Sequence, residues 1–222
     1  MDAKTKLAVS LVIGPRTQAH AEALWSDFAD RTDHQLPALI TTDEYRVYPG
    51  ALLATYGLSK PVPRTGKRGR PRQPRLVPPR ELVYAMVHKT RQKGRVVRVA
   101  IRRVFGTARR LAHALARSAV STHVNTSFVE RFNATVRQHH SRKARKVYTF
   151  SKNLEQHVLM SWFATASDNC CRPHLGLRVQ EEGGWRVRTP AMAAGITDPV
   201  WSIREFMHDP LLHQSLVSVP YQ

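Results

Sequence analysis

The chain has 222 residues, and 42% of them are hydrophobic, which is enough for a packed core and excludes a wholly disordered protein. It carries 35 Lys and Arg against 16 Asp and Glu, a net charge of +19 at pH 7. An excess of this size indicates a polyanionic partner, most commonly nucleic acid. An anionic membrane surface is the competing partner, but the sequence has no clean basic amphipathic helix beside apolar anchors.

The cysteines and the apolar segments bear on the compartment. Cys170 and Cys171 are adjacent, so they fit neither a zinc spacing nor a disulfide framework and favour a reducing environment. No run reaches about 18 uninterrupted apolar residues, and the N-terminus lacks the features of a signal peptide. We therefore expect a cytoplasmic protein with no membrane-spanning segment.

The first 58 residues alternate between two kinds of pattern. An apolar run over 5–13 predicts a buried strand, and residues 38–42 predict a second one. Residues 17–30 have apolar side chains at helical spacing, and a further helix is predicted over 45–56. Strand, helix, strand, helix is typical of a layered α/β fold, of which 1–58 would form the first part.

The middle of the chain is strongly basic. A stretch rich in Pro, Gly and Arg follows residue 59 and predicts an exposed linker or arm. Alternating apolar and basic residues then flank the segment TRQKG, which predicts a hairpin with one solvated, positive face. Residues 64–117 carry 17 Lys and Arg against one acid, +16 of the chain's +19. We interpret 59–122 as an insertion, made of the arm, the hairpin and a short helix, between two halves of the core.

The second half of the chain is predicted to be mainly helical. One helix is expected over 126–139, and Ser151 suits the N-cap of another that ends near residue 169. A loop or short hairpin over 180–190 and two short helices follow. Residues 123–178 would complete the core, and 179–222 would form a C-terminal tail.

Asp43 stands at the C-terminal end of the second predicted strand. A carboxylate there is held rigidly and faces the edge at which open α/β sheets bind ligands. The alternative is that Asp43 caps the helix that follows, a position for which Asp is a preferred residue. On position alone, the capping role is the commoner one.

Glu130 lies near the start of the helix predicted over 126–139, and six Lys and Arg but no acid follow it over 131–146. A lone Glu in such surroundings is most simply a surface ion-pair partner. Arg137, however, is seven residues further on, so it shares a helix face with Glu130, and Asn133 flanks that face. A carboxylate in line with an amide and a cation suits a site for a divalent metal and a phosphate.

The arm contains a short motif for DNA. Arg68-Gly69-Arg70-Pro71 matches the core of the AT-hook, an extended segment that places Arg in the narrow minor groove of A·T-rich DNA. Lys67 and Arg72 extend the same basic run. A solvated basic linker with non-specific attraction for phosphates explains these residues equally well.

Several longer segments together resemble one family. The runs NTSFVERFNATVRQ, RKARKVYTFSKNLEQH and CRPHLGLR, in this order, resemble the C-terminal half of DDE-type transposases of the insertion-sequence-one family. LITTDEYRVYPGALLATYG resembles the segment of that family that carries the second catalytic Asp, and DAKTKLAVSLVIGPRT the strand before it. RTPAMAAGITDPVWSIREF resembles the tail of a long-form branch. The resemblance covers most of the chain, roughly residues 2–208.

This resemblance implies an α/β fold with an RNase H-like core, as in ribonuclease H and retroviral integrases, and an enzyme that cleaves and transfers DNA strands during transposition. By position, Asp43 is the second catalytic acid and Glu130 the third, and both bind Mg²⁺ or Mn²⁺, of which a complete site holds two ions. The implied partner is double-stranded DNA, at transposon ends and target, bound by a homo-oligomer near the nucleoid of a bacterium or archaeon. Neither a membrane nor a small-molecule substrate is implied.

Nine basic side chains are expected to bind this DNA. Arg137 matches the basic residue that follows the catalytic Glu by seven positions in the family and is thought to touch the transposon end. The complete set is Lys67, Arg68, Arg70, Arg72, Arg137, Arg142, Lys143, Arg145 and Lys146.

The sequence departs from the family pattern at its start. The family has a first catalytic Asp on the first strand of the sheet, upstream of the segment that matches residues 2–14. Asp2 matches a turn Asp between the second and third strands, so it is a poor substitute for that acid. We therefore expect an N-terminally truncated chain whose core is incomplete and folds poorly by itself.

Two non-enzymatic alternatives remain open. A truncated, inactive transposase remnant would only bind DNA, through residues 59–118 and 131–146. An RNA-associated protein would explain the charge as well, but the basic block holds only Tyr84 and Phe105 as aromatic residues, which is few for stacking on single strands.

Overall fold

A computed structural model describes residues 1–62, 73–144 and 146–208. The chain forms two compact units, each described by itself. Unit 1 comprises Met1–Val9 and Val129–Gln222, and unit 2 comprises Ser10–Phe128. The boundaries differ from those predicted at residues 58 and 122, because the basic middle segment belongs to the same unit as the first α/β elements.

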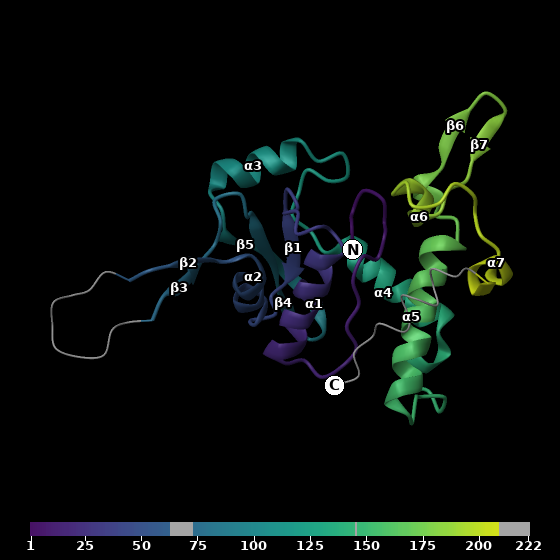
Figure 1. Ribbon diagram of the computed structural model, residues 1–222, viewed down its shortest axis with the longest axis horizontal. Helices are drawn as coiled ribbons and strands as arrows, with labels where there is room; N and C mark the ends of the chain where they lie inside the picture. Colours follow the sequence, from purple (N-terminus) through teal and green to yellow (C-terminus); the bar gives the residue numbers. More distant parts are fainter. Residues whose placement is uncertain (63–72, 145, 209–222) are drawn as a thin grey trace. The chain divides into compact units, whose positions relative to one another are not determined.

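A three-stranded sheet is the centre of unit 2 (Figure 1). The strand order is β1 (Ile40–Asp43), β4 (Tyr84–Gln92) and β5 (Arg95–Phe105). β4 pairs in parallel with β1 and antiparallel with β5. The strand predicted over 38–42 is therefore confirmed. The hairpin predicted around TRQKG is confirmed too, although its first strand is the middle strand of the sheet.

The buried part of β4 explains why this segment is not an insertion outside the core. Tyr84 and Met86 face a cluster built from Ile40 and from helices α1 (Gln18–Asp30) and α2 (Tyr48–Tyr56). Alternate residues of a strand face opposite sides of the sheet. Ala85 and Val87 accordingly pack with Val124 and with Leu111 and Leu115 of α3 (Ala108–Ala116) on the other side.

Local signals set the ends of the helices in unit 2. Thr17 caps α1, its hydroxyl accepting from the amide of His20, and α1 buries Ala21 and Trp25 as the spacing predicted. The second helix begins at Tyr48, three residues later than predicted, with Pro49 in its first turn. Two short antiparallel strands, β2 (Leu58–Lys60) and β3 (Arg75–Val77), lie where only a linker was predicted.

The strand predicted over 5–13 is wrong. Lys6 has a left-handed φ of 63°, and the amide of Asp2 donates to the carbonyl of Leu7, so the segment begins as a turn. The Asn169 side chain bonds both the amide and the carbonyl of Ala8 at 3.0 Å. These backbone groups are thus satisfied by a side chain instead of a neighbouring strand.

Unit 1 is mainly helical, as predicted. Its long helices are α4 (Ser127–His139), which begins in unit 2, and α5 (Leu154–Cys170); the 3-10 turn η1 (Ser141–Lys143) lies between them. A second turn, η2 (Leu175–Leu177), precedes the hairpin β6 (Val179–Glu181) and β7 (Gly184–Arg186), and α6 (Pro190–Ala193) and α7 (Ile203–His208) follow. No helix in the described part of the chain is long and apolar enough to cross a membrane.

The predicted cap of α5 is wrong by two residues. Asn153 caps this helix, and its side-chain oxygen accepts from the amide of Gln156 at 3.0 Å. The Ser151 hydroxyl instead lies 2.8 Å from Nδ1 of His157. Both residues are good N-caps, so the sequence alone does not separate them.

Candidate functional site

Asp43 is the last residue of β1, and its side chain is 64% exposed. It does not cap the next helix: α2 begins at Tyr48, and its N-cap residue, Val47, makes no side-chain cap bond. Asp43 forms an ion pair with the Arg16 guanidinium, which is 4.0 Å away and itself exposed. The capping alternative is therefore excluded, and the carboxylate stands in solvent at a strand end.

Buried contacts fix the strand that carries Asp43. The Thr42 hydroxyl lies 2.7 Å from the hydroxyl of Tyr84, a fully buried residue. Burial raises the pKa of Tyr84 to about 12, although the Thr42 hydrogen bond lowers it. On the other side of β1, Thr41 donates to the Asn125 carbonyl at 3.2 Å. The backbone leading to Asp43 is thus held on both faces.

Glu44, which the sequence analysis did not single out, connects this strand end to the hairpin. Its carboxylate bonds Nδ1 of His88 on β4 and lies 3.9 Å from the guanidinium of Arg102 on β5. The register places Arg102 opposite Met86, so Arg102 and His88 share a face of the sheet. The register of the predicted hairpin was the one sequence signal that could have indicated this cluster.

Glu130 lies in the first turn of α4 and is exposed. A negative charge there is favoured by the partial positive charge of the helix N-terminus. Asn125 precedes the helix and accepts from the amide and hydroxyl of Ser127, at 3.1 and 2.6 Å. Arg137, half-buried, is two turns further along the same helix, so the predicted alignment with Glu130 is confirmed.

Asp2 is engaged in its own turn. Its carboxylate accepts from the amide of Thr5 at 2.8 Å, from the Thr5 hydroxyl and from the Lys4 amide. Burial opposes the ionised form, but these hydrogen bonds together lower the pKa of Asp2. This arrangement fits the expected turn role of Asp2 and not that of a metal ligand.

The chemistry of Asp43 and Glu130 fits a hard divalent cation. Mg²⁺ and Mn²⁺ prefer carboxylate oxygens and retain several waters, so exposed carboxylates at the ends of regular elements suit them. The two residues belong to different units. The described residues hold no group of three or more His, Cys, Asp or Glu that could hold a metal.

The predicted DNA-binding residues fall into two sets. Five of them, Lys67, Arg68, Arg70, Arg72 and Arg145, lie outside the described residues. Arg142 and Lys146 are exposed beyond the end of α4, as a DNA contact requires. Lys143 is half-buried, and burial lowers its pKa.

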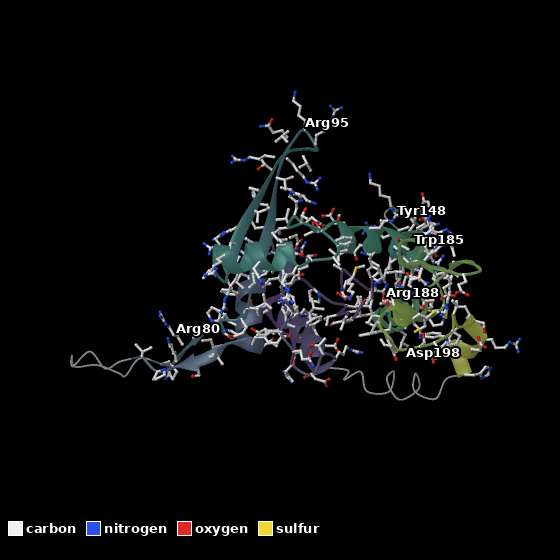
Figure 2. The ribbon with its side chains drawn as sticks, turned by 90° about the horizontal axis from the view of Figure 1, so that it is seen from above. Arg80, Arg95, Tyr148, Trp185, Arg188 and Asp198 are labelled. Atoms are coloured by element: carbon white, nitrogen blue, oxygen red, sulfur yellow. The ribbon has the colours of Figure 1, made fainter. Side chains whose placement is uncertain are left out.

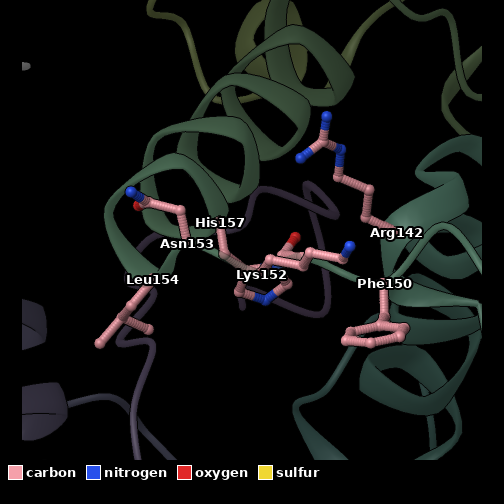
Figure 3. Close-up of a pocket in the computed structure, with 7 residues that line it drawn as sticks. Arg142, Phe150, Lys152, Asn153, Leu154 and His157 are labelled. Carbon is pink, nitrogen blue, oxygen red and sulfur yellow. The ribbon is translucent and has the colours of Figure 1, made fainter.

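A basic cavity of about 360 Å³ contains one of these residues, Arg142 (Figure 3). Lys152 supplies a second cation, and Phe150 presents an exposed ring. Burial lowers the pKa of His157 in the wall, and the nearby charges of Lys143 and Arg142 lower it further. The complete lining is Arg142, Phe150, Ser151, Lys152, Asn153, Leu154 and His157.

No protein-family model matches the chain, and neither a curated protein nor a solved structure matches it. The described residues form a mixed α/β structure with small sheets. The residues and their geometry are therefore the basis for the function proposed below.

Proposed function

We propose that this chain is part of a DDE-type transposase with an RNase H-like core, which binds duplex DNA and cleaves and transfers its strands with Mg²⁺ or Mn²⁺. The observation that carries the proposal is Asp43, an exposed carboxylate at the C-terminal end of a half-buried parallel strand, without a capping role. Open α/β sheets bind ligands at this edge. The +19 charge of the chain supplies attraction for DNA phosphates.

A hydrogen bond within unit 2 joins β1 to the segment that precedes α4. Thr41, two residues before Asp43, is hydrogen-bonded to the Asn125 carbonyl. Glu130 follows Asn125 by only five residues. The segment that leads into the Glu130 helix is therefore tied to the strand that ends at Asp43.

The family resemblance assigns metal binding to Asp43 and Glu130, and it assigns to Arg137 a DNA phosphate two helical turns beyond Glu130. A bound divalent ion lowers the pKa of a water or 3′-hydroxyl and stabilises the leaving oxygen in such reactions. Arg16, close to Asp43, balances part of the carboxylate's charge before an ion or DNA arrives.

DNA binding without cleavage is the second candidate function. It is favoured by the excess of basic residues, 35 Lys and Arg against 16 Asp and Glu, which attracts DNA phosphates without any metal.

Nicking of supercoiled plasmid by the full chain, with Mn²⁺ or Mg²⁺ and with EDTA, tests the proposal. We expect metal-dependent nicking that Asp43→Asn and Glu130→Gln abolish, because each change removes a ligand charge with little change in shape. Glu155→Gln, also an exposed first-turn Glu, and Asp198→Asn are matched controls that keep activity.

Binding measurements separate the remaining outcomes. Plasmid or duplex binding without metal-dependent nicking would leave only the second candidate. Tighter binding to structured RNA than to duplex DNA would contradict both. A Mn²⁺-dependent rise in melting temperature that Glu130→Gln removes would support metal binding independently of activity.

A further inference from the structure

The outer part of the hairpin β4–β5 extends beyond the core of unit 2. β1 ends where Asp43 pairs with Val87, and the hairpin continues alone as a two-stranded segment, here called the ribbon, of 88–92 and 95–100. Five residues at about 3.4 Å each give it a length of about 17 Å. Figure 2 shows the hairpin standing out from its surroundings, with Arg95 at its end.

The ribbon and its base carry cations on both faces, but exposed apolar side chains are concentrated on one of them. The register and the alternation of strand residues assign the side chains to these faces. The polar face consists of His88, Thr90, Gln92, Arg95, Arg98 and Arg102. The opposite face carries the basic residues Lys89, Arg91 and Arg103. It also carries Val96, Val99 and Ile101, which are 45%, 58% and 51% exposed. The hairpin thus has the predicted solvated, positive face, but its other face is also exposed and also carries cations.

A ribbon with both faces in solvent gains little from burial, so it is marginally stable alone. The turn favours it, because Lys93 and Gly94 both have the positive φ that a tight hairpin turn requires. Residues 88–103 carry seven Lys and Arg and no acid. A second copy paired along this edge would bring like charges together, whereas a polyanion would neutralise them.

We propose that the ribbon lies in the major groove of duplex DNA, with Arg95 and Arg98 on phosphates that border the groove. The groove is about 12 Å wide and admits a two-stranded ribbon, whose strands are about 4.8 Å apart. Thr90 and Gln92 on the same face offer hydrogen bonds to base edges. The proposal rests on the duplex DNA of the proposed function, and not on its catalysis.

Arg95 and Arg98 are the residues best placed for phosphates. Arg102, nearer the base, lies beside the Glu44 carboxylate, which offsets part of its charge. Within the described residues, neither Arg95 nor Arg98 forms an ion pair, and both are exposed. Changing only these two leaves the Glu44 cluster at the base of the hairpin unchanged.

The experiment measures affinity of the full chain for a 25-base-pair DNA duplex of random sequence by fluorescence anisotropy, over a series of salt concentrations. We expect Arg95→Gln with Arg98→Gln to weaken binding more than tenfold at low salt. The slope of log K against log salt should become shallower by about 1.8, since each phosphate contact contributes about 0.9. Arg95→Lys with Arg98→Lys keeps the charges and should keep the slope.

The matched control is Arg110→Gln with Arg204→Gln, which removes the same charge from exposed positions outside β4 and β5. We expect its salt slope to equal that of the unaltered chain. Failure of the unaltered chain to bind duplex DNA would overturn the proposed function itself. An equal loss of affinity and an equal change of salt slope from the Arg95 and Arg98 substitutions and from the control substitutions would overturn only the proposed role of the ribbon.

A duplex RNA of the same sequence distinguishes the groove. Its major groove is deep and narrow, so the ribbon cannot enter it. We expect the Gln pair at Arg95 and Arg98 to leave RNA affinity within twofold of the control pair. An equal loss on both duplexes would overturn the major-groove assignment, and circular dichroism of each variant checks that the sheet is intact.

Discussion

Tyr84 provides a test of how unit 2 holds the strand of Asp43. Its side chain is fully buried, and its hydroxyl is hydrogen-bonded to Thr42, the residue before Asp43. Tyr84→Phe removes this hydroxyl and leaves the ring in place. At neutral pH we expect a loss of about 1 kcal/mol of unfolding free energy, typical of one hydrogen bond. The Thr42 hydroxyl keeps a second acceptor, the Asp43 carbonyl at 2.7 Å.

The same substitution has the opposite effect at high pH. Burial raises the pKa of Tyr84 from 10.0 to about 12 in the folded chain. Because the pKa of Tyr84 is higher in the folded chain than in the unfolded chain, the protonated hydroxyl stabilises the folded chain fully below pH 10. This stabilisation is lost as the pH rises to 12. Two pKa units correspond to about 2.7 kcal/mol. The unaltered chain is therefore about 1 kcal/mol more stable than Tyr84→Phe at neutral pH, and it becomes about 1.7 kcal/mol less stable once Tyr84 has lost its proton at high pH.

Urea unfolding of both chains between pH 8 and pH 12, followed by circular dichroism, measures this difference. Other groups that titrate in this range are common to both chains and cancel. Tyr148→Phe is the control, because it also removes a tyrosine hydroxyl but Tyr148 is 100% exposed. A difference between the unaltered chain and Tyr84→Phe that stays constant from pH 8 to pH 12 would refute the reasoning.

Three further substitutions test other parts of the fold. Gly94→Ala should reduce the stability of the hairpin by about 1 to 2 kcal/mol, because Ala is strained at φ 78°. No atom lies near the added carbon, so the backbone strain is the whole effect. Faster amide exchange in β4 and β5 would measure it. Asn153→Ala should lower the unfolding free energy by about 1 kcal/mol, and Ser151→Ala should lower it by much less. Equal decreases for the two variants in urea unfolding would argue against Asn153 as the cap. Leu52→Ala should cost about 2 to 5 kcal/mol, because Leu52 is fully buried, and a loss under 1 kcal/mol would show that the core of unit 2 is loosely packed.

Elements whose signals are local could be predicted from the sequence. The helix over 17–30 has both its cap and its apolar spacing within the element, and the structure has it over Gln18–Asp30. The hairpin likewise has Lys93 and Gly94 between two alternating runs, which specifies turn and register together. Neither prediction needed knowledge of what the element packs against.

Elements that depend on a distant partner were predicted less well. The apolar run over 5–13 suits a strand, but a strand also needs a neighbour, and here the Asn169 side chain takes the Ala8 backbone groups. Conversely, residues 84–87 looked like part of a basic insertion, because the arginines of β5 dominate its composition. Their parallel pairing with β1, over forty positions away, makes them core.

In the candidate site, too, features set by local sequence were predicted, and contacts between distant segments were not. The sequence predicted Asp43 at a strand end, but only the start of α2 at Tyr48 excludes the capping role. Glu130 and Arg137 share α4, so their alignment followed from helical spacing alone. The contacts of Glu44 with the hairpin were missed, because they join residues that are far apart in sequence and meet only through the sheet register.

The sheet register also connects the ribbon with Asp43. Asp43 is opposite Val87, and Arg98 is opposite Thr90, three residues further along β4, which is about 10 Å. DNA advances about 3.4 Å per base pair, so this distance corresponds to about three base pairs. A phosphate bound by Arg98 would thus lie only a few steps from one presented to Asp43.

This closeness predicts a kinetic result that distinguishes two roles of the ribbon. If Arg95 and Arg98 only add affinity, replacing both with Gln raises KM for plasmid nicking and leaves kcat unchanged. If they position the reacting phosphate, kcat falls as well, because positioning is realised in the transition state. We expect kcat to fall, since β4 joins the ribbon directly to the register position of Asp43. An effect on KM alone would show that the ribbon acts only as an anchor.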